Sequence, residues 1–161
     1  MSAAIRPAAP ADAALLLALV RELAEYEREP DAVEATEAML RDALFGPRPA
    51  AEAVIAEADG GPAGFALWFH NFSTWKGRRG LYLEDLYVRP AFRGRGVGRA
   101  LLEHLARVAV ARGCGRFEWS VLDWNAPAIG FYRALGAEPM DGWTTMRVSG
   151  AALAALAGRG A

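Results

Sequence analysis

The sequence is poor in cysteine and histidine, has no excess of basic residues and contains no long hydrophobic run. Each shortage excludes a class of protein. The single cysteine, Cys114, cannot form an intrachain disulfide bond and leaves no cysteine cluster for zinc. The two histidines, His70 and His104, lack the spacing of metal ligands, so we expect no metal site. The net charge of −1 argues against nucleic acid as a main partner, and no segment reaches the roughly 18 apolar residues of a membrane-spanning helix.

What is present is typical of one globular domain. A chain of 161 residues is long enough to bury one hydrophobic core. Its composition, 53% hydrophobic and 23% charged, is too apolar for a disordered chain. The apolar run over residues 13–20 passes directly into the helical pattern of residues 21–27 without a signal-peptide cleavage site. We therefore expect a single domain over residues 1–161, located in the cytoplasm and without a membrane partner.

Hydrophobic periodicity and turn residues predict a series of strands and helices. The expected strands cover residues 4–6, 52–58, 64–71, 80–89, 116–122 and 143–148. The expected helices cover residues 11–28, 36–45, 99–111 and 125–135, and an Ala/Leu segment runs to residue 156. The turn at residues 59–62 predicts a hairpin between the second and third strands. The order of elements mixes antiparallel and parallel pairing, so we expect an α+β fold with one mixed sheet.

The glycine-rich loop Arg93–Gly98, between a strand and a helix, is the sharpest motif of the sequence. The start of a helix presents unpaired N–H groups and the positive end of the helix dipole, and glycines let a ligand approach the backbone closely. Such a site suits a pyrophosphate. The alternate glycines fit no Rossmann fingerprint, and Gly98-Arg99-Ala100 replaces the Gly-Lys-Ser/Thr of a P-loop. The alternative to a pyrophosphate site is a tight turn in which the glycines serve the backbone conformation alone.

The loop resembles that of the GNAT superfamily of acyltransferases, which reads Arg/Gln-x-x-Gly-x-Gly/Ala. Arg93, Gly96 and Gly98 match this pattern in register. From about residue 4 to residue 148, the chain is similar to the spermidine/spermine (diamine) N-acetyltransferase branch. The segments that carry this likeness are residues 5–8, 22–27, 83–88, 123–125 and 130–137. The resemblance implies the GNAT fold, with a mixed central β-sheet flanked by helices.

The resemblance also implies that acetyl-CoA is the acetyl donor, and it indicates the residues that hold it. Strands that splay apart leave N–H groups that can polarise a thioester carbonyl, and Leu86, Tyr87 and Val88 would supply such backbone groups. Asn125 and Ala128 would contact the pantetheine arm. The remaining implied contacts, around the pyrophosphate, are Arg93, Gly94, Arg95, Gly96, Val97, Gly98 and Arg99.

Two side chains are candidates for proton transfer on the same resemblance. Tyr132 matches the tyrosine that protonates the departing CoA thiolate in the resembled family. The alternative interpretation of Tyr132 is an aromatic side chain packed in the core. An alkylammonium ion has no lone pair, so a base must first remove a proton, and the likeness nominates Glu84. The alternative for Glu84 is a surface ion pair. Because neighbouring residues of a strand face opposite sides, Asp85 is expected to be structural.

The expected acceptor is a small cationic amine. Tyr26 matches a substrate-contacting position of the resembled branch, and Glu84 and Glu118 add negative charge. The glutamates of residues 25–29 either line a groove that binds the cationic amine or form a solvated helix face. This predicts direct acetyl transfer to a diamine, a polyamine or a lysine-like amino acid, in a homodimer. Two alternatives stay open: another acceptor, such as an aminoglycoside or a protein N-terminus, and an acyl-CoA-binding module without turnover.

Overall fold

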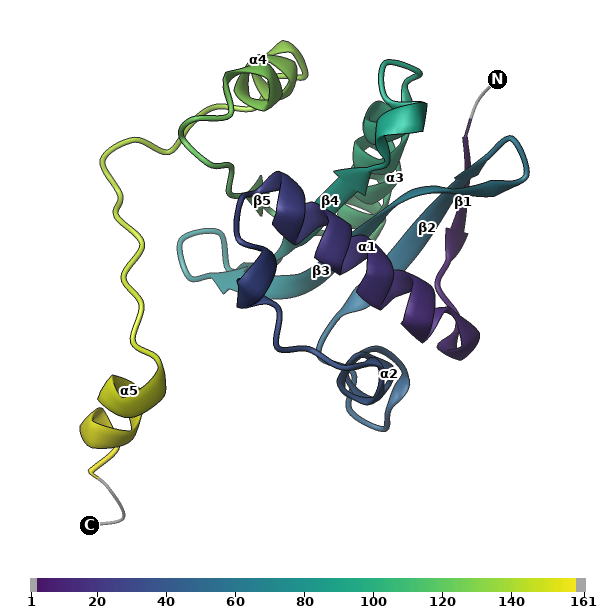
Figure 1. The fold of residues 1–161 in the computed structure, drawn as a ribbon. Helices are drawn as coiled ribbons and strands as arrows, with labels where there is room; N and C mark the ends of the chain where they lie inside the picture. Colours follow the sequence, from purple (N-terminus) through teal and green to yellow (C-terminus); the bar gives the residue numbers. More distant parts are fainter. Residues whose placement is uncertain (1–2, 159–161) are drawn as a thin grey trace. The chain divides into compact units, whose positions relative to one another are not determined.

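A computed structural model describes residues 3–158 of the chain, and their contacts divide into two compact units. The first unit ends at Leu122 and the second begins at Asp123. The first holds a β-sheet and its covering helices, and the second holds two short helices, α4 and α5 (Figure 1). The single domain that we expect over residues 1–161 stays a prediction.

The elements of the first unit follow the predicted series closely. The strands are β1 (Ala4–Pro7), β2 (Glu52–Ala58), β3 (Gly61–Ser73), β4 (Arg78–Val88) and β5 (Phe117–Trp119). The α-helices are α1 (Ala13–Tyr26), α2 (Glu37–Phe45) and α3 (Val97–Ala111), and short 3-10 helices are η1 (Pro10–Asp12), η2 (Pro30–Ala32) and η3 (Pro90–Phe92). β2 coincides with its prediction, whereas β5 is shorter than the strand expected over residues 116–122, because only three of its residues pair with β4.

The described strands form one mixed sheet in the order β1-β2-β3-β4-β5. The first three pairings are antiparallel, and β5 joins β4 in parallel, so the expected mixed sheet is confirmed. The predicted hairpin is also present. Asp59 and Gly60 join β2 to β3 with φ angles of 54° and 78°, the left-handed backbone of a tight turn that matches the twist of a hairpin.

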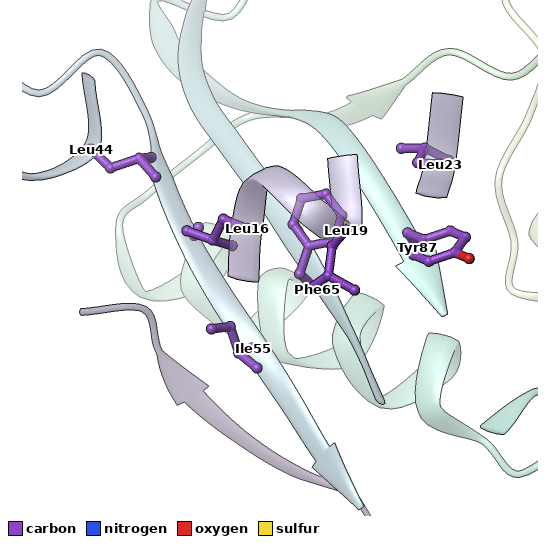
Figure 2. Packing of buried hydrophobic residues seen from close by; sticks show 8 residues of the cluster. Leu16, Leu19, Leu23, Leu44, Ile55, Phe65 and Tyr87 are labelled. Carbon is purple, nitrogen blue, oxygen red and sulfur yellow. The ribbon is translucent and has the colours of Figure 1, made fainter. Parts of the chain in front are cut away.

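Helices cover both faces of the sheet. α1 and α2 pack on one face, where Leu16, Leu19 and Leu23 recur at the spacing of a helix stripe and meet Phe65 and Tyr87 of the sheet (Figure 2). On the other face, α3 contacts β1, β3 and β4 (Figure 1). Full burial of each such leucine contributes about 1.5–3 kcal/mol to folding. The core therefore fixes α1 over the end of β4, where the candidate site lies.

The second unit contains α4 (Ala126–Ala134) and α5 (Gly150–Leu156). The strand expected over residues 143–148 is wrong, because this segment has no regular secondary structure. Its threonines and valine favour an extended chain, but a strand also needs a neighbour to accept its hydrogen bonds. Within residues 3–158, no strand pairs with this segment, and Trp143 and Met146 are exposed.

Candidate functional site

β4 contains a β-bulge at Glu84. Trp68 of β3 lies opposite Leu83. The preceding residue of β3, Leu67, lies opposite Asp85, so Glu84 is an extra residue of β4. A bulge sets two residues of one strand against one residue of its partner. It therefore interrupts the regular alternation of side chains between Leu83 and Asp85.

Because of the bulge, Glu84 and Asp85 both face the side of the sheet that α1 covers. Leu67 packs against the core cluster under α1, and opposed residues share a face, so Asp85 faces that side too. Leu83 shares the other face with Trp68, so Glu84, the next residue, also faces α1. The sequence predicted that Glu84 and Asp85, as neighbours in a strand, face opposite sides of the sheet. That prediction is wrong at the bulge.

A third carboxylate completes this group. Glu27, the residue after α1, lies close enough to Glu84 that the charge of Glu84 adds to partial burial in raising the pKa of Glu27. The pKa of Asp85 is raised to about 6, first by burial and then by the negative charges of Glu84 and Glu27. Three crowded carboxylates repel one another when all are ionised, and a cation placed among them relieves that repulsion. The group therefore suits an ammonium ion.

The end of β4 has an open edge next to this acidic group. The pairing of β4 with β5 runs from Leu81 to Leu83 and stops before the bulge. Among the described strands, none pairs with residues 84–88 on that side. The residues predicted to contact the donor, Leu86–Val88, lie on this edge, where backbone groups are available to a ligand. Glu118 of β5 is opposite Tyr82 and shares the face of the acidic group.

The glycine-rich loop follows η3 and opens onto α3. Gly94 and Gly96 have φ angles of 73° and 81°, and a Cβ atom at either position would meet no atom of the described chain within 4 Å. α3 begins at Val97, two residues earlier than predicted, and its first hydrogen bond runs from Ala100 N to Gly96 O at 2.9 Å. The N–H groups of the first turn point out of the helix end. The loop thus combines space with the donors that an anion needs.

Arg95 of the loop and Arg99 of α3 form ion pairs through their side chains. The guanidinium of Arg95 pairs with Asp59 of the β2–β3 turn at 2.8 Å. Arg99 pairs with Glu103, one turn further along α3, at 2.7 Å. The predicted role of these arginines at the pyrophosphate stays a prediction.

The third arginine, Arg93, brings several predicted site residues together. Its Cζ atom lies 5.0 Å from the ring centroid of Tyr26 and 5.7 Å from that of Tyr87. Its Nε atom donates a hydrogen bond to the carbonyl oxygen of Val88 at 2.9 Å. The sequence predicted a contact of Arg93 with the donor, and it missed these links to α1 and β4, which depend on packing.

The remaining candidates lie together on α4, in the second unit. The side chain of Asn125 accepts a hydrogen bond from the backbone N–H of Ala128 at 3.3 Å, which confirms the expected N-cap. Tyr132 lies on the same helix, and its ring is 5.6 Å from that of Phe131, measured between centroids. The expected contacts of Asn125 and Ala128 with the donor, and the acid role of Tyr132, stay predictions.

Residues 3–158 contain no group of three histidine, cysteine, aspartate or glutamate side chains that could hold a metal ion. None of the helices in this part of the chain has the length and apolar character to cross a membrane.

Comparisons with known proteins agree with this geometry. Residues 16–137 match the model of the acetyltransferase (GNAT) family. The chain is 42% identical to a thialysine N-epsilon-acetyltransferase of Bos taurus, over 96% of this chain and 97% of the relative. It is 35% identical to a human spermidine/spermine N(1)-acetyltransferase-like protein 1, over 89% of this chain and 22% of that longer protein. Among solved structures, an integron cassette protein from V. cholerae superposes with a TM-score of 0.81 at 28% identity, covering 98% of both chains.

Proposed function

The chain belongs to the acetyltransferase (GNAT) family, and we propose that it transfers the acetyl group of acetyl-CoA to a small amine that carries a second positive charge. Acetyl-CoA is the donor substrate, and the acceptor is a diamine, a polyamine or a lysine-like amino acid. The names of the bovine and human relatives support these acceptor classes. We also propose that the enzyme acts as a homodimer, as the resembled branch implies.

The observation that carries the proposal is the group of carboxylates from Glu27, Glu84 and Asp85 beside the open end of β4. Negative charge attracts a cationic amine and raises its local concentration. The nearby backbone of Leu86–Val88 suits a thioester, and the loop before α3 suits a pyrophosphate. One side of the site thus attracts the acceptor while the other holds the donor.

The proposed reaction needs a base and an acid. Glu84 takes a proton from the ammonium group, directly or through water, and frees the lone pair of the amine. The amine nitrogen then attacks the thioester carbonyl carbon; a C–N bond forms and the C–S bond breaks. We propose Tyr132 as the donor of the proton that the departing sulfur receives. The ammonium loses two protons in all and the sulfur gains one, so each turnover releases one proton.

A CoA-release assay with matched amines tests the proposal. At saturating acetyl-CoA, we expect 1,4-diaminobutane and thialysine to react with a higher kcat/KM than butylamine, because a second charge is attracted by the carboxylates. Equal or faster reaction of butylamine would contradict the preference for a second charge and leave the acetyl transfer standing. No CoA release with any diamine, polyamine, lysine analogue or aminoglycoside would contradict the proposed activity itself.

A further inference from the structure

We infer that Arg93 is a positioning residue that fixes Tyr26 on the acceptor side of the site and ties it to the strand that holds the donor. The inference rests on the proposed function, in which Tyr26 contacts the amine and Leu86–Val88 contact acetyl-CoA. It assigns Arg93 a role in amine binding that its place in the pyrophosphate motif does not suggest.

The geometry around Arg93 supports this role. The guanidinium lies near the ring of Tyr26, the last residue of α1, and near the ring of Tyr87, which is buried in β4. The bond from Nε to the carbonyl of Val88 sets the direction of the group. A planar guanidinium can approach aromatic faces and donate a hydrogen bond at the same time. Arg93 therefore links the end of one helix to the end of one strand.

Tyr26 lies where a contact with Arg93 can influence its position. The residue is 38% exposed, so contacts as well as burial determine where its ring lies. The chain turns away immediately after it, since Arg28 has a φ angle of 64° and ends the helical path. A cationic group beside the ring restricts where the ring can lie. Glu27, one of the three carboxylates, is the next residue of the chain.

A separate contact keeps α1 in place and makes the role of Arg93 testable. The guanidinium of Arg89 binds both carboxylate oxygens of Glu22 on α1, at 2.9 and 3.1 Å. Its other nitrogen donates to the carbonyl of Pro62 at 3.3 Å. Because this pair and the leucine core hold α1 on the sheet, replacement of Arg93 should remove its contact with Tyr26 while the helix stays docked.

The link has a consequence for the order of events in the site. Donor contacts at Leu86–Val88 and at the loop restrict the backbone on both sides of Arg93, and hence the position of Tyr26. A first ligand that orders a second site raises the affinity of that site, and the effect is reciprocal. Acetyl-CoA should therefore strengthen amine binding, and Arg93 should carry part of this coupling.

The test compares Arg93→Gln, Arg93→Lys, Tyr26→Leu and the double variant Tyr26→Leu/Arg93→Gln. We expect R93Q to raise the KM for 1,4-diaminobutane about fivefold or more, a usual size for coupling between sites. The dissociation constant of acetyl-CoA, measured by calorimetry, should rise by a smaller factor than the KM for the amine. R93K keeps the charge and should recover part of the loss, and the double variant should be no worse than Tyr26→Leu alone.

Arg41→Gln is the matched control, because it makes the same chemical change in an exposed ion pair with Glu37 of α2, away from the proposed site. We expect this control to leave the KM for the amine unchanged. A rise in the acetyl-CoA constant of R93Q with an unchanged amine KM would overturn the inference, and so would additive effects in the double variant. If R93Q does not melt cooperatively, R93K is measured in its place, with a smaller expected rise in the KM for the amine. A wild-type enzyme that releases no CoA with any amine would instead overturn the proposed function.

Discussion

Glu84 and Asp85 are consecutive residues of β4, yet both face α1, because the bulge inserts Glu84 between the pairs that Leu83 and Asp85 make with β3. A regular strand would separate the two carboxylates by the thickness of the sheet. Their shared face explains why the pKa of Asp85 is raised by the charge of Glu84 as well as by burial. This relationship leads to the first two predictions.

Asp85→Asn should stabilise the protein at neutral and alkaline pH. The pKa of Asp85 in the folded protein is about 6, above its ordinary value of 3.8, so folding favours the protonated form. Ionisation of Asp85 therefore lowers the free energy of unfolding. This loss is absent below pH 3.8, grows between pH 3.8 and about 6, and is complete at higher pH. A pKa shift of this size corresponds to about 3 kcal/mol at most. Thermal melts should show a higher Tm for D85N at pH 8 and a shrinking difference towards pH 4. The exposed Asp31→Asn is the control, and equal pH dependence of D85N and wild type would contradict the prediction.

Glu84→Gln should reduce activity most strongly for acceptors with two positive charges. Loss of the base and of one carboxylate should lower kcat/KM for 1,4-diaminobutane about tenfold or more, and less for butylamine. The rise of kcat/KM with pH should also flatten. Glu37→Gln, on the exposed pair with Arg41 of α2, is the control. An equal loss for both amines would show that Glu84 does not distinguish their charge.

Gly96→Asp should weaken acetyl-CoA binding. The change places a side chain and a negative charge at the end of α3, in a backbone conformation with a φ angle of 81°. We expect an affinity loss of about tenfold or more, which corresponds to about 1.4 kcal/mol. Gly113→Asp is the matched control, since Gly113 at the other end of α3 has a φ angle of 71° and equal space. Unchanged binding by calorimetry in a folded G96D variant would exclude the loop as the donor site.

Tyr132→Phe should slow turnover and spare folding. Removal of one hydroxyl group should leave the melting temperature and the affinity for acetyl-CoA nearly intact. We expect kcat to fall about tenfold to a thousandfold under conditions in which the chemical step limits the rate. A kcat within twofold of wild type under those conditions would show that Tyr132 is not the acid.

Light scattering at micromolar concentration should give the mass of a dimer. In the second unit, α5 exposes Leu153 and Leu156, which are 52% and 75% accessible as residues. Burial of such apolar surface between two chains favours association. The double variant Leu153→Glu/Leu156→Glu should therefore shift the mass towards the monomer. A monomer mass for the wild-type chain would contradict the homodimer.

The sequence by itself determined the features that depend on neighbouring residues. The periodicity of β2, the turn at Asp59 and Gly60 and the cap at Asn125 are all present as predicted. The loop before α3 was recognisable for the same reason, because only glycine adopts its left-handed backbone easily. These local signals predicted the elements, and the loop motif together with the segments named above carried the resemblance to the family.

Only the tertiary structure decided which of the candidate residues act together. The bulge at Glu84 is a property of the register between two strands, and no pattern within β4 reveals it. The contacts of Arg93 with Tyr26 join segments more than sixty residues apart in the sequence, and they exist because the core docks α1 over β4. The prediction of a strand over residues 143–148 was wrong because sequence patterns do not show whether a neighbouring strand is present. A strand requires a partner as well as a suitable sequence, and the described part of the chain supplies none.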